Sequence, residues 1–284
     1  MEKFLYRWFL PFVLAFILSL FLYLFFKDKI CYVGGNAMNP FFKKGQIVLV
    51  KNATDIKKND IVLLDNPLRK SEQSQKLSLK RCVALPGDTV EIIDKKLYVN
   101  HRLQDSYFCQ FDRTFFFYSQ KEVEIAKSKY GIYLDKNVDM TKTVAISEPL
   151  FLKIKSDNIL QHVSEDVISN DLSDKCLYPF STFFSWNRDN YGPVVVPKKG
   201  MTIKMCLKYF VFYKYLLEKF EGVKVIYKDG SFFSNGKPIE HYTFKGDYYF
   251  VLNDYRDDVS DSRTFGLVKS ELILGKYFMK FDFE

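Results

Sequence analysis

The chain has 284 residues, of which 48% are hydrophobic and 18% aromatic. Such a composition supplies a packed core and excludes a disordered chain. The formal net charge is +8, but the lysines are spread along the chain and form no block of like charge. The charge therefore indicates an ordinary solvated surface with mild attraction to anionic lipid, and we predict no nucleic-acid partner.

The cysteine and histidine patterns give little support for metal or redox chemistry. The five cysteines form no Cys-x-x-Cys pair, which argues against a zinc or thioredoxin-type site. One disulfide, between Cys109 and Cys176, is left open. His101, His162 and His241 lie far apart and in no motif, so they support neither a Ser-His-Asp site nor a His-based metal site. We predict no cofactor and no metal ion.

Residues 8–26 form a run without charge that is long enough to cross the hydrocarbon core of a membrane as a helix. A cleaved signal peptide has a shorter apolar region followed by a small-x-small cleavage site, and residues 27–30 offer no such site. We therefore predict an uncleaved transmembrane anchor, preceded by a short segment over residues 1–7. The positive charges on the two sides of the run are nearly balanced, so they leave its orientation open.

Residues 31–104 alternate short apolar runs with polar turns, which is the pattern of a strand-rich unit. Strands are predicted over residues 46–50 and 60–64, and a hairpin turn over residues 94–96. Residues 246–284 return to the same pattern. The two segments are therefore expected to form one mainly β core.

Residues 105–245 are an insertion between these two segments. Within it, residues 205–220 carry apolar side chains at helical spacing, and Gly222 fits the C-terminal end of that helix. The helix could lie on a membrane surface or pack on the insertion's own sheet. Its modest charge favours packing on the sheet.

Three short stretches carry the candidate chemistry: residues 35–40, residues 79–90 and residues 253–266. In the second, Lys80 stands at the mouth of an apolar run and precedes a Pro-Gly-Asp turn. Burial lowers the pKa of a lysine and can turn it into a general base. Taken alone, an edge-strand lysine that discourages aggregation is the simpler interpretation.

In order and spacing, the three stretches resemble the conserved boxes of type I signal peptidases, membrane-bound serine proteases that remove secretory signal peptides. The family patterns are Ser-Met-x-Pro, Lys-Arg-x-x-x-x-Pro-Gly-Asp and Gly-Asp-Asn-x-x-x-Ser-x-Asp-Ser-Arg-x-x-Gly. The second box matches closely, and the third matches at Asp254, Asp261, Ser262, Arg263 and Gly266. The chain departs from the family at Ala37 (family Ser), Gln46 (family Asp), Asn253 (family Gly), Tyr255 (family Asn) and Val259 (family Ser).

The resemblance implies a fold and a set of roles. The fold is a signal-peptidase-type antiparallel β catalytic domain, with residues 31–104 and 246–284 as its core and residues 105–245 as an enlarged cap subdomain. Lys80 is the implied general base, and Ser262 is implied to hydrogen-bond it. The implied supporting residues are Met38, Pro40, Arg81, Asp254, Asp261 and Arg263. We expect Asp261 and Arg263 each to need another partner, because they are not immediate neighbours along a strand.

Ala37 occupies the position of the family's nucleophilic serine, whose backbone N–H is the implied oxyanion donor. Alanine has no nucleophilic atom, and no Ser, Thr or Cys lies within five residues of it. Loss of a nucleophile costs about a million-fold in kcat, so we expect cleavage to be lost. Three interpretations stay open: a signal peptidase with a substituted or silenced nucleophile, a non-catalytic homologue that binds signal peptides or regulates an active paralogue, and a structural protein that inherits the fold.

The resemblance also implies a location and partners. The chain is expected in the inner, cytoplasmic membrane as a single-pass protein. Its N-terminus is expected in the cytoplasm and its large domain on the outer, periplasmic side. The implied partners are the signal peptides of secretory preproteins and the lipid bilayer, with an active paralogue as a further candidate.

Overall fold

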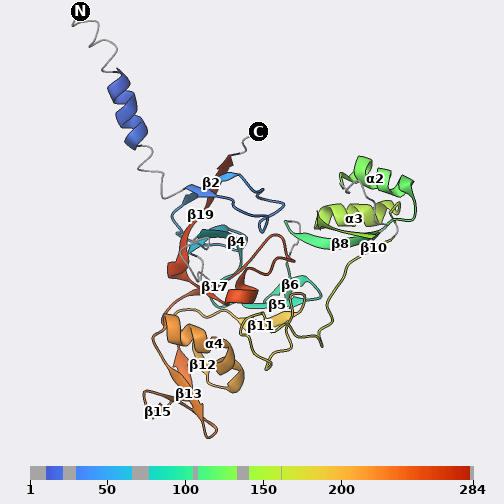
Figure 1. Cartoon of the computed structure of the whole chain (residues 1–284). Coiled ribbons are helices and arrows are strands. Elements are labelled where there is room, and N and C mark those ends of the chain that lie inside the picture. Colours follow the sequence, from blue (N-terminus) through green and yellow to red (C-terminus); the bar gives the residue numbers. More distant parts are fainter. Residues whose placement is uncertain are drawn as a thin grey trace, which may run out of the picture.

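A computed structural model describes residues 11–21, 30–65, 77–104, 108–132, 141–160 and 162–281. Strands from both ends of the chain form its main antiparallel sheet, in the order β1-β2-β19-β3-β4-β17-β18 (Figure 1). These strands are β1 (Ile30–Tyr32), β2 (Ile47–Lys51), β3 (Ile61–Asp65), β4 (Leu77–Ala84), β17 (Tyr248–Leu252), β18 (Val268–Lys269) and β19 (Ile273–Phe281). The prediction of a mainly β core is confirmed, and the two expected strands near residues 46–50 and 60–64 begin one residue later.

A second sheet has the order β11-β5-β6-β7. Its strands are β5 (Thr89–Ile93), β6 (Lys96–Val99), β7 (Arg102–Leu103) and β11 (Tyr191–Val195). Asp94 and Lys95 connect β5 to β6 and both have positive φ, 48° and 66°, as a two-residue primed hairpin turn requires. The predicted hairpin is confirmed, although Lys96 is the first residue of β6.

The first part of the insertion forms a small unit with its own core. It contains β8 (Gln110–Phe116), α2 (Gln120–Tyr130), β9 (Thr141–Ser147), α3 (Glu148–Asp157) and β10 (Val163–Ser164). The strands pair in the order β10-β8-β9, and α2 and α3 lie together on this unit, beside the main body (Figure 1). Phe115, Ile146 and Ile154 are among the buried residues of a hydrophobic cluster separate from that of the main body. This unit therefore has a hydrophobic core of its own.

The second part of the insertion packs on the main body instead. It contains β12 (Thr202–Lys204), α4 (Leu207–Phe220), β13 (Val225–Lys228), β14 (Ser231–Ser234), β15 (Lys237–Pro238) and β16 (His241–Thr243). The apolar face of α4 presents Phe212 and Leu216 to the hydrophobic cluster that also holds Val90 of β5 and Phe250 of β17. The predicted helix is confirmed, and its apolar face is buried in the protein. The described insertion thus consists of two parts with different cores.

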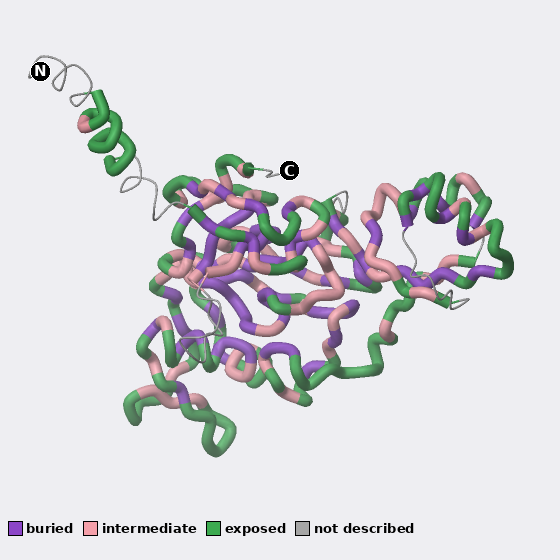
Figure 2. The backbone as a smooth tube through the Cα atoms, turned by 45° about the horizontal axis from the view of Figure 1, so that its top comes forward, coloured by how far each residue is buried: buried purple, intermediate pink, exposed green. Residues whose placement is uncertain are grey.

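Near the N-terminus, residues 11–21 form a helix whose apolar side chains, Phe12 and Phe16 among them, are exposed (Figure 2). No helix among the described residues is long and apolar enough to cross a membrane. The predicted anchor over residues 8–26 extends beyond the described helix at both ends, and those parts of it lie outside the described residues.

The disulfide that was left open between Cys109 and Cys176 is absent. Both cysteines are free; Cys109 is buried and Cys176 is exposed.

Candidate active site

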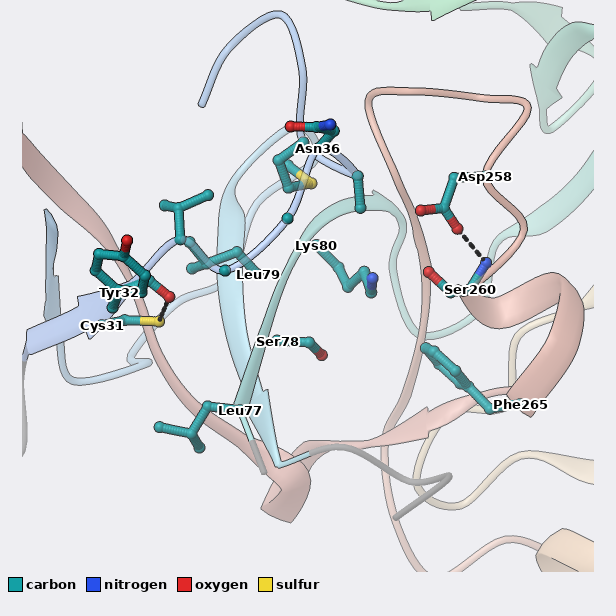
Figure 3. A pocket seen from close by; sticks show the side chains of 15 residues that line it. Cys31, Tyr32, Asn36, Leu77, Ser78, Leu79, Lys80, Asp258, Ser260 and Phe265 are labelled. Atoms are coloured by element: carbon teal, nitrogen blue, oxygen red, sulfur yellow. Dashed lines mark hydrogen bonds between the residues drawn. The ribbon is translucent and has the colours of Figure 1, made fainter. Parts of the chain in front are cut away.

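A pocket of about 290 Å³ opens where the three sequence boxes meet (Figure 3). Residues 31–38 form one wall and residues 77–80 of β4 form another. Asp258, Ser260 and Phe265, from the third box, close the far side. Ala37 and Lys80 line this one pocket, so the fold brings the first two boxes together as the resemblance implies.

Hydrogen bonds of the backbone hold the first box as a compact turn. Asn39 N–H donates to the carbonyl of Asn36 at 2.9 Å, and Phe42 N–H donates to the carbonyl of Met38 at 2.8 Å. Met38 is 3% exposed and packs in the cluster that includes Val48 and Val50 of β2. Burial of one apolar side chain thus fixes the turn to the sheet, while Ala37 stays at the pocket wall.

The remaining residue of the first box, Pro40, is exposed. It lies beyond the pocket wall, because the pocket lining ends at Met38. The amide of Tyr255, in the third box, donates to the carbonyl of Ala37 at 3.0 Å. The turn is therefore held from two sides, by the sheet below it and by the third box beside it.

Lys80 reaches into the pocket from the middle of β4. Its Cα pairs with that of Val62 on β3, and the side chain is buried at 4% exposure. Its ammonium donates to Oδ1 of Asn253 at 2.6 Å. Burial lowers the pKa of Lys80, while the charges of Asp261 and Asp258 raise it and that of Arg263 lowers it. Burial dominates, so a larger share of Lys80 is neutral, and a neutral amine can accept a proton.

Arg81, the next residue on β4, forms an ion pair with Asp254. Its Nε and Nη2 donate to the two carboxylate oxygens, each at 2.6 Å. Its Nη1 donates to the carbonyl of Asn59 at 2.8 Å, and the guanidinium lies over the ring of Phe108. Asp254 is fully buried, and a buried charge needs such a partner. Arg81 and Asp254 therefore fix the end of β17, from which Asn253 reaches Lys80.

Asp261 and Arg263 pair with each other, so the expectation that each needs another partner is wrong. Nη2 and Nε of Arg263 lie 2.7 and 3.0 Å from the Asp261 carboxylate. The segment is a helical turn, α5 (Ser262–Phe265), with Asp261 as its N-cap residue. Burial works against the charge of Asp261, but the charge and hydrogen bonds of Arg263 hold its pKa below the usual value.

Ser262 lies close behind the site, but the expected hydrogen bond to Lys80 is absent among the described residues. Its Oγ accepts the backbone N–H of Val251 at 3.0 Å. The residue is fully buried at the first position of α5. Ser262 thus ties α5 to β17, and the partner of Lys80 is Asn253.

Three residues at or near the site were missed as contributors. Asn253 and Tyr255 were noticed only as departures from the family pattern, and Ser260 carried no signal. Asn253 holds Lys80 and Tyr255 holds Ala37. The hydroxyl of Tyr255 also donates to Asp112 of β8 at 2.8 Å. The available signal was size: Asn253 and Tyr255 are both larger than the family residues at their positions. A larger side chain must make contacts that the smaller one does not.

The comparisons with known proteins point to one family. The family model described as signal peptidase, peptidase S26, matches residues 5–150 and 228–281, more than half of the chain. Signal peptidase I V of Bacillus subtilis (strain 168) is 38% identical over 72 residues, which cover 24% of this chain and 39% of that protein. Signal peptidase I of Bacillus licheniformis is 29% identical over 34% of this chain and 50% of that protein.

A longer match is to signal peptidase I of Streptococcus pneumoniae serotype 4, at 26% identity over 48% of this chain and 72% of that protein. The chain thus spans half or less of the length of the two Bacillus relatives. A solved signal peptidase I from Enterococcus faecalis V583 aligns with 78% of this chain and 97% of that chain at 16% identity. Its TM-score is 0.27. On the family match, this chain belongs to the signal peptidase family, peptidase S26.

Proposed function

We propose that the chain binds the signal peptides of secretory preproteins in the pocket beside Lys80, and that residue 37 contributes no nucleophile to this site. One observation carries the proposal: Ala37 and the buried Lys80 line the same pocket. The residue that the resemblance aligns with the family's serine thus lines the same pocket as Lys80, but an alanine side chain carries no reactive atom. Any cleavage must then use another nucleophile.

An extended peptide fits the free side of β4. Residues 77–81 of β4 pair with β3 on one side, whereas the ladder with β17 uses only Arg81, Cys82 and Ala84. In the described part of the chain, no strand covers the other side of residues 77–80, which also line the pocket. An extended segment can add there as a further strand, and shallow pockets beside it can select small side chains.

The membrane location is part of the same proposal. The uncharged run over residues 8–26 and the membership of the signal peptidase family support a single-pass anchor in the inner membrane, with the large domain on the outer side. In this arrangement residues 31–104 and 246–284 act as the peptide-binding core and residues 105–245 as a cap. Binding without release would also withhold signal peptides from an active paralogue.

The experiment is a binding measurement with the full chain in detergent. The ligand is a fluorescent peptide in which a signal peptide ending in Ala-x-Ala is followed by a mature sequence. The chain is titrated into this peptide, and the fluorescence anisotropy of the peptide is measured. We expect saturable binding that weakens at least about tenfold, or 1.4 kcal/mol, in the Lys80→Met variant. Lys44→Met, which changes an exposed lysine, is the matched control and should bind unchanged. Equal binding by all three forms, or no binding at all, would contradict the proposal.

A further inference from the structure

Two hydroxyl groups that are distant from Ala37 in sequence share its pocket. Ser78 and Ser260 both line the pocket together with Ala37 and Lys80 (Figure 3). Neither was visible from the neighbourhood of residue 37 in the sequence. The fold therefore supplies candidate nucleophiles that the first box lacks.

Ser260 and Lys80 are held by the same side chain. Oδ1 of Asn253 accepts from the Lys80 ammonium at 2.6 Å, and Nδ2 of Asn253 donates to Oγ of Ser260 at 3.2 Å. Nδ2 also donates to the carbonyl of Asp258 at 2.8 Å. Since both hydrogens of the amide have acceptors, its orientation is fixed and Oδ1 must face the lysine. The carboxamide of Asn253 thus bridges the hydroxyl of Ser260 and the amine of Lys80.

The hydrogen bonds leave the proton of Ser260 available. Its Oγ accepts from Asn253, and a hydroxyl that accepts still has its own hydrogen to donate. The backbone N–H of Ser260 donates to Oδ1 of Asp258 at 2.9 Å, which holds the loop in place. Figure 3 shows the hydroxyl of Ser260 on the side of the pocket toward which the Lys80 side chain extends. No direct hydrogen bond joins Ser260 to Lys80 among the described residues, so the Lys80 amine must turn from Asn253 toward Ser260 to accept that proton.

Ser78 is the weaker of the two candidates. Its Oγ is buried and has no hydrogen-bond partner among the described residues, so a substrate carbonyl could not reach it without a change in the pocket. Ser260 is exposed to the pocket. A substrate carbonyl can therefore reach Ser260, and Asn253 bridges its hydroxyl to Lys80.

We propose that Ser260 is the nucleophile of this chain and that Lys80 is its general base, positioned by Asn253. The inference rests on the proposed function, because it needs a signal peptide in the pocket. The Oγ–H proton passes to the Lys80 amine, and Oγ forms a bond to the scissile carbonyl carbon. The C–N bond then breaks, and the leaving amine takes the proton from Lys80. Water, deprotonated by Lys80, then attacks the ester carbonyl, the C–Oγ bond breaks and Oγ takes the proton back from Lys80, which releases the signal peptide as a carboxylic acid.

The test is cleavage of a preprotein by the full chain in detergent. The unmodified chain should cleave, and Ser260→Ala should lower kcat by about a million-fold, to background. Ser231→Ala, at an exposed serine of β14, is the matched control and should cleave as the unmodified chain does. Peptide binding is measured alongside, and we expect Ser260→Ala to bind the peptide normally.

Two further measurements separate a catalytic role from a structural one. An Ala-x-Ala peptide with a C-terminal nitrophenyl ester should acylate the unmodified chain with release of nitrophenolate, and mass spectrometry should locate the acyl group on Ser260. In a Ser260→Ala background, Ala37→Ser should restore cleavage, because it returns a hydroxyl to the position from which the family attacks.

The outcomes separate this inference from the proposed function. Peptide binding without cleavage by the unmodified chain would overturn the role of Ser260 and leave the binding function intact. Cleavage that survives Ser260→Ala, or an acyl group found on Ser78, would overturn it as well. Absence of both binding and cleavage would overturn both proposals.

Discussion

Lys80 and Arg81 are neighbours on β4 with equal burial, 4% exposure each, and they differ in what meets their charge. Arg81 pairs with the Asp254 carboxylate through two hydrogen bonds of 2.6 Å. Lys80 meets only the neutral amide of Asn253, and no carboxylate lies within ion-pair distance of it in the described part of the chain. The two adjacent cations of β4 thus contact the two adjacent residues that follow β17, but Arg81 meets a charged group and Lys80 meets a neutral one.

This difference indicates which of the two cations stabilises the folded structure. A bidentate ion pair in a buried place fixes geometry, so Arg81 joins β4 to the third box. A buried ammonium without a carboxylate is unfavourable in its charged form, so burial lowers the pKa of Lys80. Side chains alternate between the faces of a strand, which sends the two cations into different environments.

The largest expected effect is on the Arg81 side. Arg81→Met leaves the fully buried Asp254 without its partner, and breaking a buried pair in this way costs about 3–5 kcal/mol. Urea unfolding of the full chain in detergent should report a loss of this size. Lys57→Met, which removes a solvent-exposed partner of Asp55, should leave the unfolding free energy unchanged. Similar losses for both variants would remove the distinction between Arg81 and an ordinary surface cation.

The Lys80 side should respond to pH. Its pKa is lowered by burial in the folded chain, against about 10.4 in an unfolded chain. Between these two values the unfolded state holds the extra proton, so the unfolding free energy rises with pH. Relative to Lys80→Met, the unmodified chain should gain up to about 1.4 kcal/mol per pH unit across this interval. Parallel pH curves for the two forms would show that Lys80 keeps an ordinary pKa.

The smallest effect is expected at Ser262. Ser262→Ala removes the acceptor of the Val251 N–H, and loss of one such buried hydrogen bond costs about 1–2 kcal/mol. Because Ser262 does not contact Lys80, the variant should keep the pH dependence that Lys80 causes. The difference in unfolding free energy between Ser262→Ala and Ser262→Ala/Lys80→Met should therefore rise with pH as steeply as the difference between the unmodified chain and Lys80→Met. A changed slope would restore Ser262 as the direct partner of the lysine.

The sequence boxes predicted the site in outline and misassigned two of its contacts. Ala37, Lys80 and the third box meet at one pocket as expected, because their order in the chain is tied to strands whose apolar patterns are visible. The Asp261–Arg263 pair and the partner of Ser262 were predicted wrongly, because the segment was treated as a strand or loop and is a capped helical turn. A turn of four residues has too little periodicity to be recognised.

Local pattern was enough to determine that this chain is mainly β, that it belongs to the signal peptidase family and that residue 37 has no hydroxyl. The periodicity of apolar residues and the spacing of the boxes are properties of short stretches, so both can be read directly from the sequence. Only the tertiary structure decided that Asn253 holds Lys80 and that Ser260 shares its pocket. It also decided that the first part of the insertion has a hydrophobic core of its own, whereas the second part packs on the core of the main body. These outcomes depend on contacts between residues far apart in the chain, and such contacts exist only once the strands have paired.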